Sequence, residues 1–211
     1  MSSELLIRLA DAGKRYNRDW IFRNLSFELE PGSRLSLTGS NGSGKSTLLQ
    51  VMAGFQSLSA GSRHFIAGEK PISEDQLYKY ISIAAPYLDL PEAYSLKELL
   101  AFHFSLKPQR SNFDSAFWVE SAGLQPHLHK KIQHFSSGMK QRVKLLLALG
   151  ADVPLLLLDE PTTNLDEQGV EWYQALINKA ATTQSVVVAS NQPHEYAFCT
   201  QNIQVAAYKK P

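Results

Sequence analysis

Residues 39–47 have the composition and spacing of a phosphate-binding loop. They read GSNGSGKST, in which a glycine is followed by four residues and then by Gly-Lys-Ser. Glycines let such a loop turn its backbone N–H groups inward around phosphate oxygens. Lys45 would reach the β- and γ-phosphates of a nucleotide from the start of the next helix, and the Ser46 hydroxyl is the expected ligand of Mg²⁺. The residues expected to contact the phosphates are Ser40, Asn41, Gly42, Ser43, Gly44, Lys45, Ser46 and Thr47.

Two adjacent acids, Asp159 and Glu160, form the second candidate for chemistry. They follow the apolar run 155–158, which is typical of a parallel strand buried on both faces. Open α/β sheets bind ligands where such strands end. Because successive strand residues face opposite sides, we expect one carboxylate to bind the metal and the other to contact the attacking water. The alternative is a solvated strand end before a turn at Pro161.

The third candidate is a helix start at residues 135–139, Phe-Ser-Ser-Gly-Met. Ser136 suits the N-cap of the following helix, and the backbone of Gly138 near the helix N-terminus could approach an anion closely. Capping alone would also account for these residues. The motif therefore becomes informative only in combination with the other two.

The neighbouring patterns predict the elements that would position these residues. An alternating run at 34–38 predicts a strand before the loop, and residues 47–53 predict a helix after it that ends at Gly54. Further elements are predicted as strands at 5–9, 21–29, 65–66, 80–84, 186–190 and 203–207 and as a helix at 167–181.

Between residues 86 and 150 the pattern is helical. Residues 95–106 place leucines at helical spacing, and Ser95 with Glu98 forms a capping box. Residues 112–122 predict a second helix. Because no strand pattern interrupts this region, we predict a helical lobe inserted into an α/β core. The aromatic residues of the second helix are interpreted as packing within the lobe: Phe113, Phe117 and Trp118.

Composition limits the class of protein. With 211 residues, 44% of them hydrophobic and 19% charged, the chain suits one globular α/β domain. A net charge of +1 argues against a broad nucleic-acid-binding face. The single cysteine, Cys199, excludes an internal disulfide and fits a reducing compartment. No signal peptide is evident, and the longest apolar region, 145–158, is too short to span a bilayer.

The fixed order of these motifs resembles the nucleotide-binding domain of ATP-binding cassette (ABC) transporters, over nearly the whole chain. The resemblance implies an α/β fold with a P-loop NTPase core, which has a RecA-like mixed sheet, N-terminal antiparallel strands and an inserted helical lobe. The core would comprise residues 1–85 and 151–211, and the helical subdomain about 86–150. The cofactors implied are ATP and Mg²⁺.

The resemblance also implies a role for each motif. Residues 39–47 match the Walker A motif, and 155–159 match the Walker B motif, so that Ser46 and Asp159 would hold the metal and Glu160 would be the general base. Residues 135–139 fall at the signature motif and 164–166 at the D-loop. The residues expected to complete the nucleotide site are Tyr16, which would stack on adenine, and Ser136 and Gly138, which would contact the γ-phosphate of ATP held by a partner subunit.

The biological role implied is that of an ATPase subunit that powers a separate membrane-spanning permease. Two copies would form a head-to-tail dimer closed by ATP, on the cytoplasmic face of the membrane, with no nucleic acid as a partner. Two alternatives are a soluble ABC-type ATPase outside transport and a nucleotide-gated binding module with weak hydrolysis.

Some positions depart from the family pattern. In the signature motif, Ser137 replaces a glycine and Met139 replaces a glutamine. Pro86 stands where the family has a glutamine that contacts Mg²⁺ and water, and Asn191 stands where it has a histidine. Asn191 can donate a hydrogen bond to the γ-phosphate but cannot carry charge, while His194 is predicted on the next helix. These replacements weaken the case for fast hydrolysis more than the case for ATP binding.

Overall fold

A parallel sheet forms the centre of the molecule. The computed structural model describes residues 4–111, 113–180 and 184–209. The sheet has five strands in the order β6-β7-β8-β3-β9, and every pairing in it is parallel. Its strands in chain order are β3 (Arg34–Thr38), β6 (Ile81–Ala84), β7 (Leu155–Asp159), β8 (Ser185–Ala189) and β9 (Gln201–Gln204).

Two hydrophobic cores share this sheet. In β7 the side chains of Leu156 and Leu158 pack into the core that includes the helical lobe, whereas Leu155 and Leu157 pack into the core on the opposite face. All residues of β7 and β8 are buried, as a strand covered on both faces requires. The predicted buried parallel strand at 155–159 is therefore confirmed.

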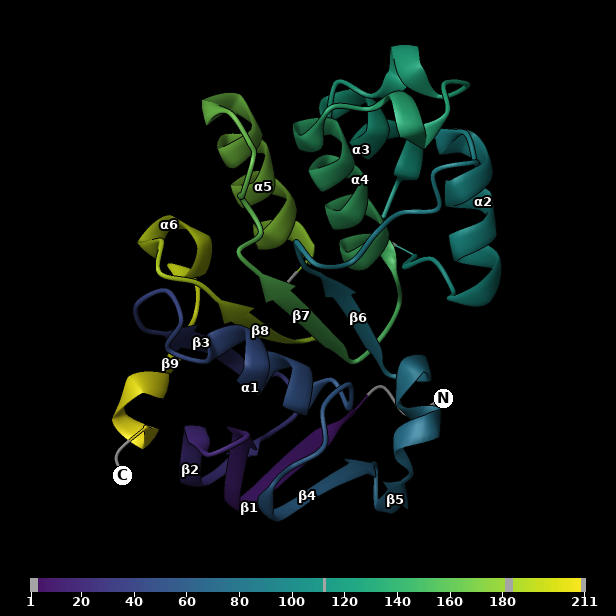
Figure 1. Ribbon diagram of the computed structural model, residues 1–211. Helices are drawn as coiled ribbons and strands as arrows, with labels where there is room; N and C mark the ends of the chain where they lie inside the picture. Colours follow the sequence, from purple (N-terminus) through teal and green to yellow (C-terminus); the bar gives the residue numbers. More distant parts are fainter. Residues whose placement is uncertain (1–3, 112, 181–183, 210–211) are drawn as a thin grey trace.

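A second sheet is antiparallel and has the order β2-β1-β4-β5. Figure 1 shows it beneath α1 (Lys45–Met52), on the side of the parallel sheet away from the helical lobe. Parallel and antiparallel pairings thus lie in separate sheets, within the expected P-loop fold. The strands of the second sheet are β1 (Leu6–Tyr16), β2 (Asp19–Leu29), β4 (Ala60–Ala67) and β5 (Lys70–Ile72).

The helical lobe contains α2 (Leu96–Leu106), α3 (Ser115–Ser121) and α4 (Ser137–Gly150). The predicted capping box is present: Glu98 N–H donates to Ser95 Oγ at 3.3 Å, and Ser95 N–H donates to Glu98 Oε2 at 2.8 Å. Figure 1 shows α4 beside α5 (Glu167–Ala180), above the sheet. The shorter helical segments of the chain are η1 (Glu74–Lys79), η2 (Gln125–His127), η3 (Ile132–His134), α6 (Pro193–Tyr196) and η4 (Val205–Tyr208).

The structure corrects three predictions of local structure. The predicted strand 203–207 ends at Gln204, because its partner β3 ends at Thr38, opposite Gln204, and the chain continues as η4. The predicted helix 112–122 begins at Ser115, since Asp114 is its N-cap. Phe117 is 51% exposed rather than packed inside the lobe. Residues 112 and 181, where two predicted helices begin and end, lie outside the described residues.

Candidate nucleotide-binding site

The phosphate loop connects β3 to α1, as its flanking patterns predict. Gly44 is the N-cap of α1 and has a φ of 102°, a left-handed conformation that strongly favours glycine. A Cβ at this position would lie 2.4 Å from Ile21 Cγ2 of β2. The antiparallel sheet therefore packs directly against the loop, and only glycine fits where it does so.

Lys45 is held inside the loop. Its side chain is 5% exposed, and Nζ donates to the carbonyl oxygens of Gly39 at 2.9 Å and Ser40 at 3.2 Å. An ammonium group tied to loop carbonyls lies where incoming phosphate oxygens would exchange for them. The Nζ atom, together with the free N–H groups at the start of α1, makes this end of the helix a cradle for an anion.

Asp159 ends β7 as a buried carboxylate without a hydrogen-bond partner. It is 1% exposed, and neither oxygen has a partner among the described residues. Burial raises the pKa of Asp159 to about 6, and the nearby Ser46 hydroxyl lowers that pKa in part. A buried carboxylate whose oxygens accept no hydrogen bond is costly, even with the Lys45 ammonium nearby, and a divalent cation would satisfy it. Asp159 and Ser46 therefore fit the predicted Mg²⁺ site.

Glu160 stands at the strained corner after β7. Its φ is 42°, which is uncommon for a residue with a Cβ, and its N–H donates to Ala189 O of β8 at 2.9 Å. Thr163 Oγ1 donates to Glu160 Oε2 at 3.4 Å. Strained backbone of this kind is concentrated at functional sites, where the surrounding structure fixes it.

Asn191 and Pro86, two of the positions predicted to depart from the family pattern, differ in their contacts. Asn191 follows β8 and donates from Nδ2 to Asn41 Oδ1 of the phosphate loop at 3.2 Å, so it lies at the expected edge of the site. Pro86 follows β6 and has no side chain that can donate a hydrogen bond. His194 lies on α6, where its Nε2 is 3.1 Å from Thr162 Oγ1.

Tyr87 is 42% exposed and lies beside the candidate site, although no motif indicated it. Burial raises the pKa of Tyr87 to about 12, the negative charge of Asp159 contributes to the rise, and Gln50 of α1 lowers it. The phenol therefore lies near both Asp159 and the first helix. The available signal was its position, one residue after the Pro86 that replaces the family glutamine.

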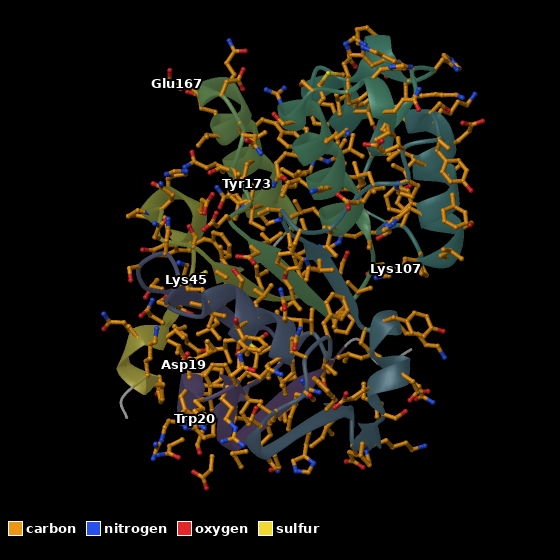
Figure 2. The ribbon with its side chains drawn as sticks, viewed as in Figure 1. Asp19, Trp20, Lys45, Lys107, Glu167 and Tyr173 are labelled. Atoms are coloured by element: carbon orange, nitrogen blue, oxygen red, sulfur yellow. The ribbon has the colours of Figure 1, made fainter. Side chains whose placement is uncertain are left out.

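Tyr16 lies at the end of β1, where the chain turns back into β2. It is 44% exposed, and Lys14 Nζ is 5.2 Å from its ring centroid. The neighbouring Trp20 is flanked by the guanidinium groups of Arg15 and Arg23 at 5.6 and 5.8 Å from its ring centroid. Figure 2 shows Asp19 and Trp20 of this hairpin on the same side of the molecule as Lys45. The role of Tyr16 in binding adenine stays a prediction.

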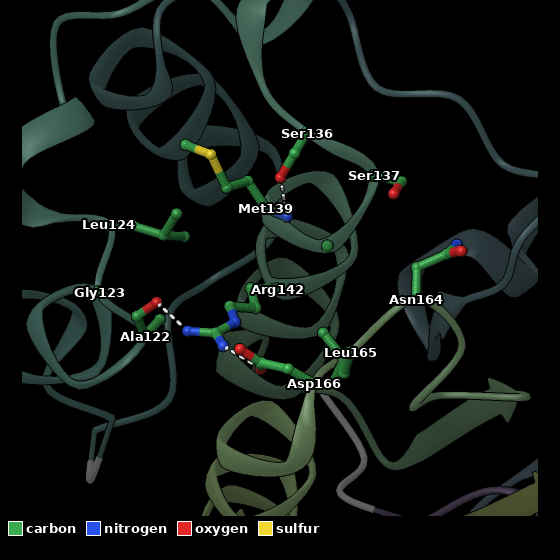
Figure 3. A pocket seen from close by; sticks show the side chains of 11 residues that line it. Ala122, Gly123, Leu124, Ser136, Ser137, Met139, Arg142, Asn164, Leu165 and Asp166 are labelled. Carbon is green, nitrogen blue, oxygen red and sulfur yellow. Dashed lines mark hydrogen bonds and ion pairs between the residues drawn. The ribbon is translucent and has the colours of Figure 1, made fainter.

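A second cradle lies at the start of α4. A cavity of about 410 Å³ is lined by Ser136, Gly138, Arg142 and the D-loop residues 164–166, and by no residue of the phosphate loop among those described. Ser136 Oγ accepts from Met139 N–H at 3.2 Å, which confirms it as the N-cap. Figure 3 shows Arg142 bridging Asp166 and the carbonyl of Ala122, so that the cavity has a fixed wall.

The family model described as "ABC transporter" matches residues 22–163. The chain belongs to the ABC transporter family. Among curated relatives of this ABC ATPase, an uncharacterized ABC transporter ATP-binding protein of Haemophilus influenzae is 29% identical over 205 residues, covering 95% of this chain and 81% of that protein. The cytochrome c biogenesis ATP-binding export protein CcmA of Pseudomonas putida is 34% identical, covering 81% of this chain and 82% of its own length.

Solved structures of ABC proteins share its fold. A putative ABC transporter ATP-binding protein from Pyrococcus furiosus superimposes with a TM-score of 0.79 at 21% identity, covering 97% of this chain and 100% of that one. The dimeric bacterial ABC transporter cassette MJ0796 gives the same TM-score and identity and covers 95% of each chain. The chain is thus an ABC nucleotide-binding domain with the P-loop NTPase fold.

Proposed function

We propose that this ABC domain binds and hydrolyses ATP with Mg²⁺ as one subunit of a transporter whose membrane-spanning part is a separate protein. The observation that carries the proposal is the buried, unpartnered carboxylate of Asp159 near Ser46 and Lys45 at the phosphate loop. Two named relatives, CcmA and Nod factor export ATP-binding protein I, are export proteins, which supports transport over a soluble ATPase outside transport.

Each residue of the site would have a distinct task. Lys45 and the loop N–H groups would bind the β- and γ-phosphates, and Tyr16 would stack on adenine. Ser46 and Asp159 would hold Mg²⁺, which when bound would neutralise phosphate charge. Glu160 would take the proton of the attacking water, and Asn191 would donate a hydrogen bond to the γ-phosphate.

The second cradle supports a head-to-tail homodimer. Within one protomer the cavity at Ser136 and Gly138 is lined by no phosphate-loop residue, so a single chain presents two separate anion-binding features. A second copy, rotated by a two-fold axis, would bring each cradle onto the other copy's ATP. ATP would then hold the two copies together, and hydrolysis would release them.

A groove on the helical lobe supports docking of the membrane partner at the cytoplasmic face of the membrane. The groove has a volume of about 260 Å³ and is lined largely by apolar side chains of the segment 88–91 and of α2. Phe102 and Leu106 at its margin are 46% and 67% exposed, and the Phe102 ring stacks on Tyr94 with centroids 5.8 Å apart. We propose that a short helix of the permease occupies this groove.

The variant Glu160→Gln tests the function. Glutamine keeps the shape of the side chain but cannot accept the proton, so the variant should bind ATP with unchanged affinity, lose turnover by about 100-fold or more and accumulate as a dimer with Mg²⁺ and ATP. Phosphate release, binding of a fluorescent ATP analogue and light scattering would measure the three properties. Ser185→Ala, at the opposite end of β8, serves as a folded control.

Two outcomes would contradict the proposal. Unchanged turnover in Glu160→Gln would rule out Glu160 as the base. Absence of turnover in the wild-type protein, with ATP-dependent dimerisation intact, would instead support a nucleotide-gated binding module with weak hydrolysis. The contact between Asn191 and Asn41 is the observation that favours this second candidate, because an amide at this position cannot carry charge.

A further inference from the structure

The turn that carries Glu160 is held by contacts from several elements. Glu160 O accepts from Thr163 N–H at 3.0 Å, and Thr162 O accepts from Leu165 N–H at 3.0 Å. Pro161 O accepts from the side chain of Gln141 at 2.7 Å, within the protein interior. Another main-chain donor of the turn, Thr162 N–H, bonds to a side chain of α6.

That side chain is Glu195 of α6. Its Oε1 accepts from Thr162 N–H at 2.7 Å and also from the Thr162 hydroxyl. Glu195 is 1% exposed, and its Oε2 has no hydrogen-bond partner among the described residues. Burying a carboxyl group costs free energy unless it is fully hydrogen-bonded, so an apolar residue here would pack at a lower cost. Its presence calls for a reason beyond packing.

The backbone of Glu195 is itself anchored. Its carbonyl oxygen accepts from the hydroxyl of the fully buried Tyr173 of α5 at 2.9 Å, and its N–H donates to Gln192 O at 3.0 Å. The neighbouring carbonyl of His194 accepts from Gln174 of α5 at 3.4 Å. Glu195 therefore connects a fixed point on α5 to the corner of the turn.

We propose that Glu195 is a positioning residue that fixes the direction of Glu160. By holding Thr162, it stabilises the turn in which Glu160 keeps its φ of 42°, a conformation that persists only where neighbouring contacts impose it. The inference rests on the proposed role of Glu160 as general base. No described hydrogen bond joins Glu195 to the phosphate loop, so we expect its loss to lower kcat more than it raises the KM for ATP.

The test separates kcat from KM in three variants. Glu195→Ala removes both hydrogen bonds, and Glu195→Asp keeps a carboxyl group but withdraws its oxygen from Thr162. We expect kcat to fall up to about 100-fold in both, as small misplacements of a catalytic group cause, with the KM for ATP within about twofold of wild type. Glu195→Gln keeps an acceptor oxygen at the same distance, and it should restore kcat to within about threefold of wild type.

A matched control separates positioning from loss of stability. Ser185→Ala also removes the hydrogen bonds of a buried side chain, because Ser185 is 1% exposed and bonds to Gly32 and Glu30. Ser185 begins β8, at the end of the strand away from the Glu160 turn. Urea unfolding would measure the stability of each variant, and turnover would be measured well below each unfolding midpoint. We expect Ser185→Ala to lose stability while keeping its kcat.

Two results would overturn the inference. The first is wild-type kcat in folded Glu195→Ala while Glu160→Gln is inactive. The second, which decides the matter if the alanine variant does not fold, is wild-type kcat in Glu195→Asp. If Glu160→Gln keeps full turnover, the assignment of Glu160 as the base fails instead. This result distinguishes a failure of the proposed function from a failure of the positioning role of Glu195.

Discussion

Asp159 lowers the stability of the folded chain at neutral pH and, in the proposed site, is a ligand of Mg²⁺. Its carboxylate is buried at the end of β7 with both oxygens unpartnered, and this burial raises its pKa to about 6 from the ordinary value of 3.8. Between these pH values the folded chain binds the proton more tightly than the unfolded chain does. The stability from this group is thus fully present below about pH 4 and is lost as the pH rises through about 6.

We predict that Asp159→Asn is more stable than wild type at neutral pH without metal. The variant cannot ionise, so the gain in unfolding free energy should be about 3 kcal/mol at pH 7.5 and about 1 kcal/mol at pH 4.5. Urea unfolding in the presence of a chelator measures both values. An equal gain at the two pH values would contradict the pKa shift. With Mg²⁺ and ATP added, the wild-type protein should gain more stability than the variant.

At the scale of residues, the sequence predicted the local structure around a side chain where its motif is short and continuous. Lys45 and Asp159 lie in short segments whose pattern specifies both their environment and their neighbours. The position of Tyr87 near Asp159 and the contact of Glu195 with Thr162 were not predicted, because both depend on residues far away in the chain. Glu195 bonds to Thr162, 33 residues earlier, and no periodicity connects the two. Their roles in the site, like those of the other site residues, stay predictions.

At the scale of elements, α4 shows how a helix start becomes a surface for an anion. Ser136 caps the helix, and Gly138 lets the first turn approach the D-loop: a Cβ on Gly138 would lie 2.8 Å from the carbonyl oxygen of Asn164. Alanine normally stabilises a helix relative to glycine, so the close contact is what makes this position require glycine.

We predict that Gly138→Ala binds ATP normally but fails to dimerise. The added methyl group must displace either α4 or the D-loop, which should cost about 1–3 kcal/mol and distort the cavity, while the phosphate loop of the same chain stays intact. Light scattering in the Glu160→Gln background and a fluorescent ATP analogue would test this. Gly32→Ala, where no atom lies within 4 Å of the new Cβ, is the control for an added methyl group without a steric clash; Gly32 has a φ of 79°, whereas Gly138 is helical. An ATP-dependent dimer in Gly138→Ala would contradict the prediction.

The elements themselves were predicted best where apolar pattern and punctuation agree. The strand at 34–38 and the strand at 155–159 have the predicted bounds. The end of the chain was predicted less well, because a strand continues only as far as its partner. The chain continues with apolar residues after Gln204, the last residue of β9. β3 ends opposite Gln204, so its backbone offers no groups with which these residues could pair. That limit is set by the neighbouring strand and is not visible in the local sequence.

At the scale of the whole molecule, two hydrophobic cores lie on opposite faces of the parallel sheet and hold different elements. One core packs α1 and the antiparallel sheet against one face of the parallel sheet, and the other packs the helical lobe and α5 against the opposite face. Among the described residues, no helix is long and apolar enough to cross a membrane. The groove on the lobe is the surface through which we propose that a membrane partner receives the motion of the domain.

We predict that Phe102→Arg weakens binding to the permease without lowering the turnover of the isolated domain. The charged side chain would enter an apolar groove, while the phosphate loop is untouched. The control is Tyr78→Arg, because Tyr78 is 59% exposed on η1 and does not line the groove. Co-purification of each variant with the membrane proteins that are recovered with the wild-type chain measures the effect. Equal recovery of the permease with both variants would exclude the groove as the docking site.

The hydrogen bond from Gln141 to Pro161 has a consequence for the assembled dimer. Gln141 lies one turn into α4, the helix whose first residues would meet the partner's nucleotide, and Pro161 follows Glu160 of the chain's own site. One rigid helix therefore touches both active centres of the proposed dimer. If each centre biases the other through it, occupancy of the two must be cooperative, and by linkage the effect must be equal in both directions.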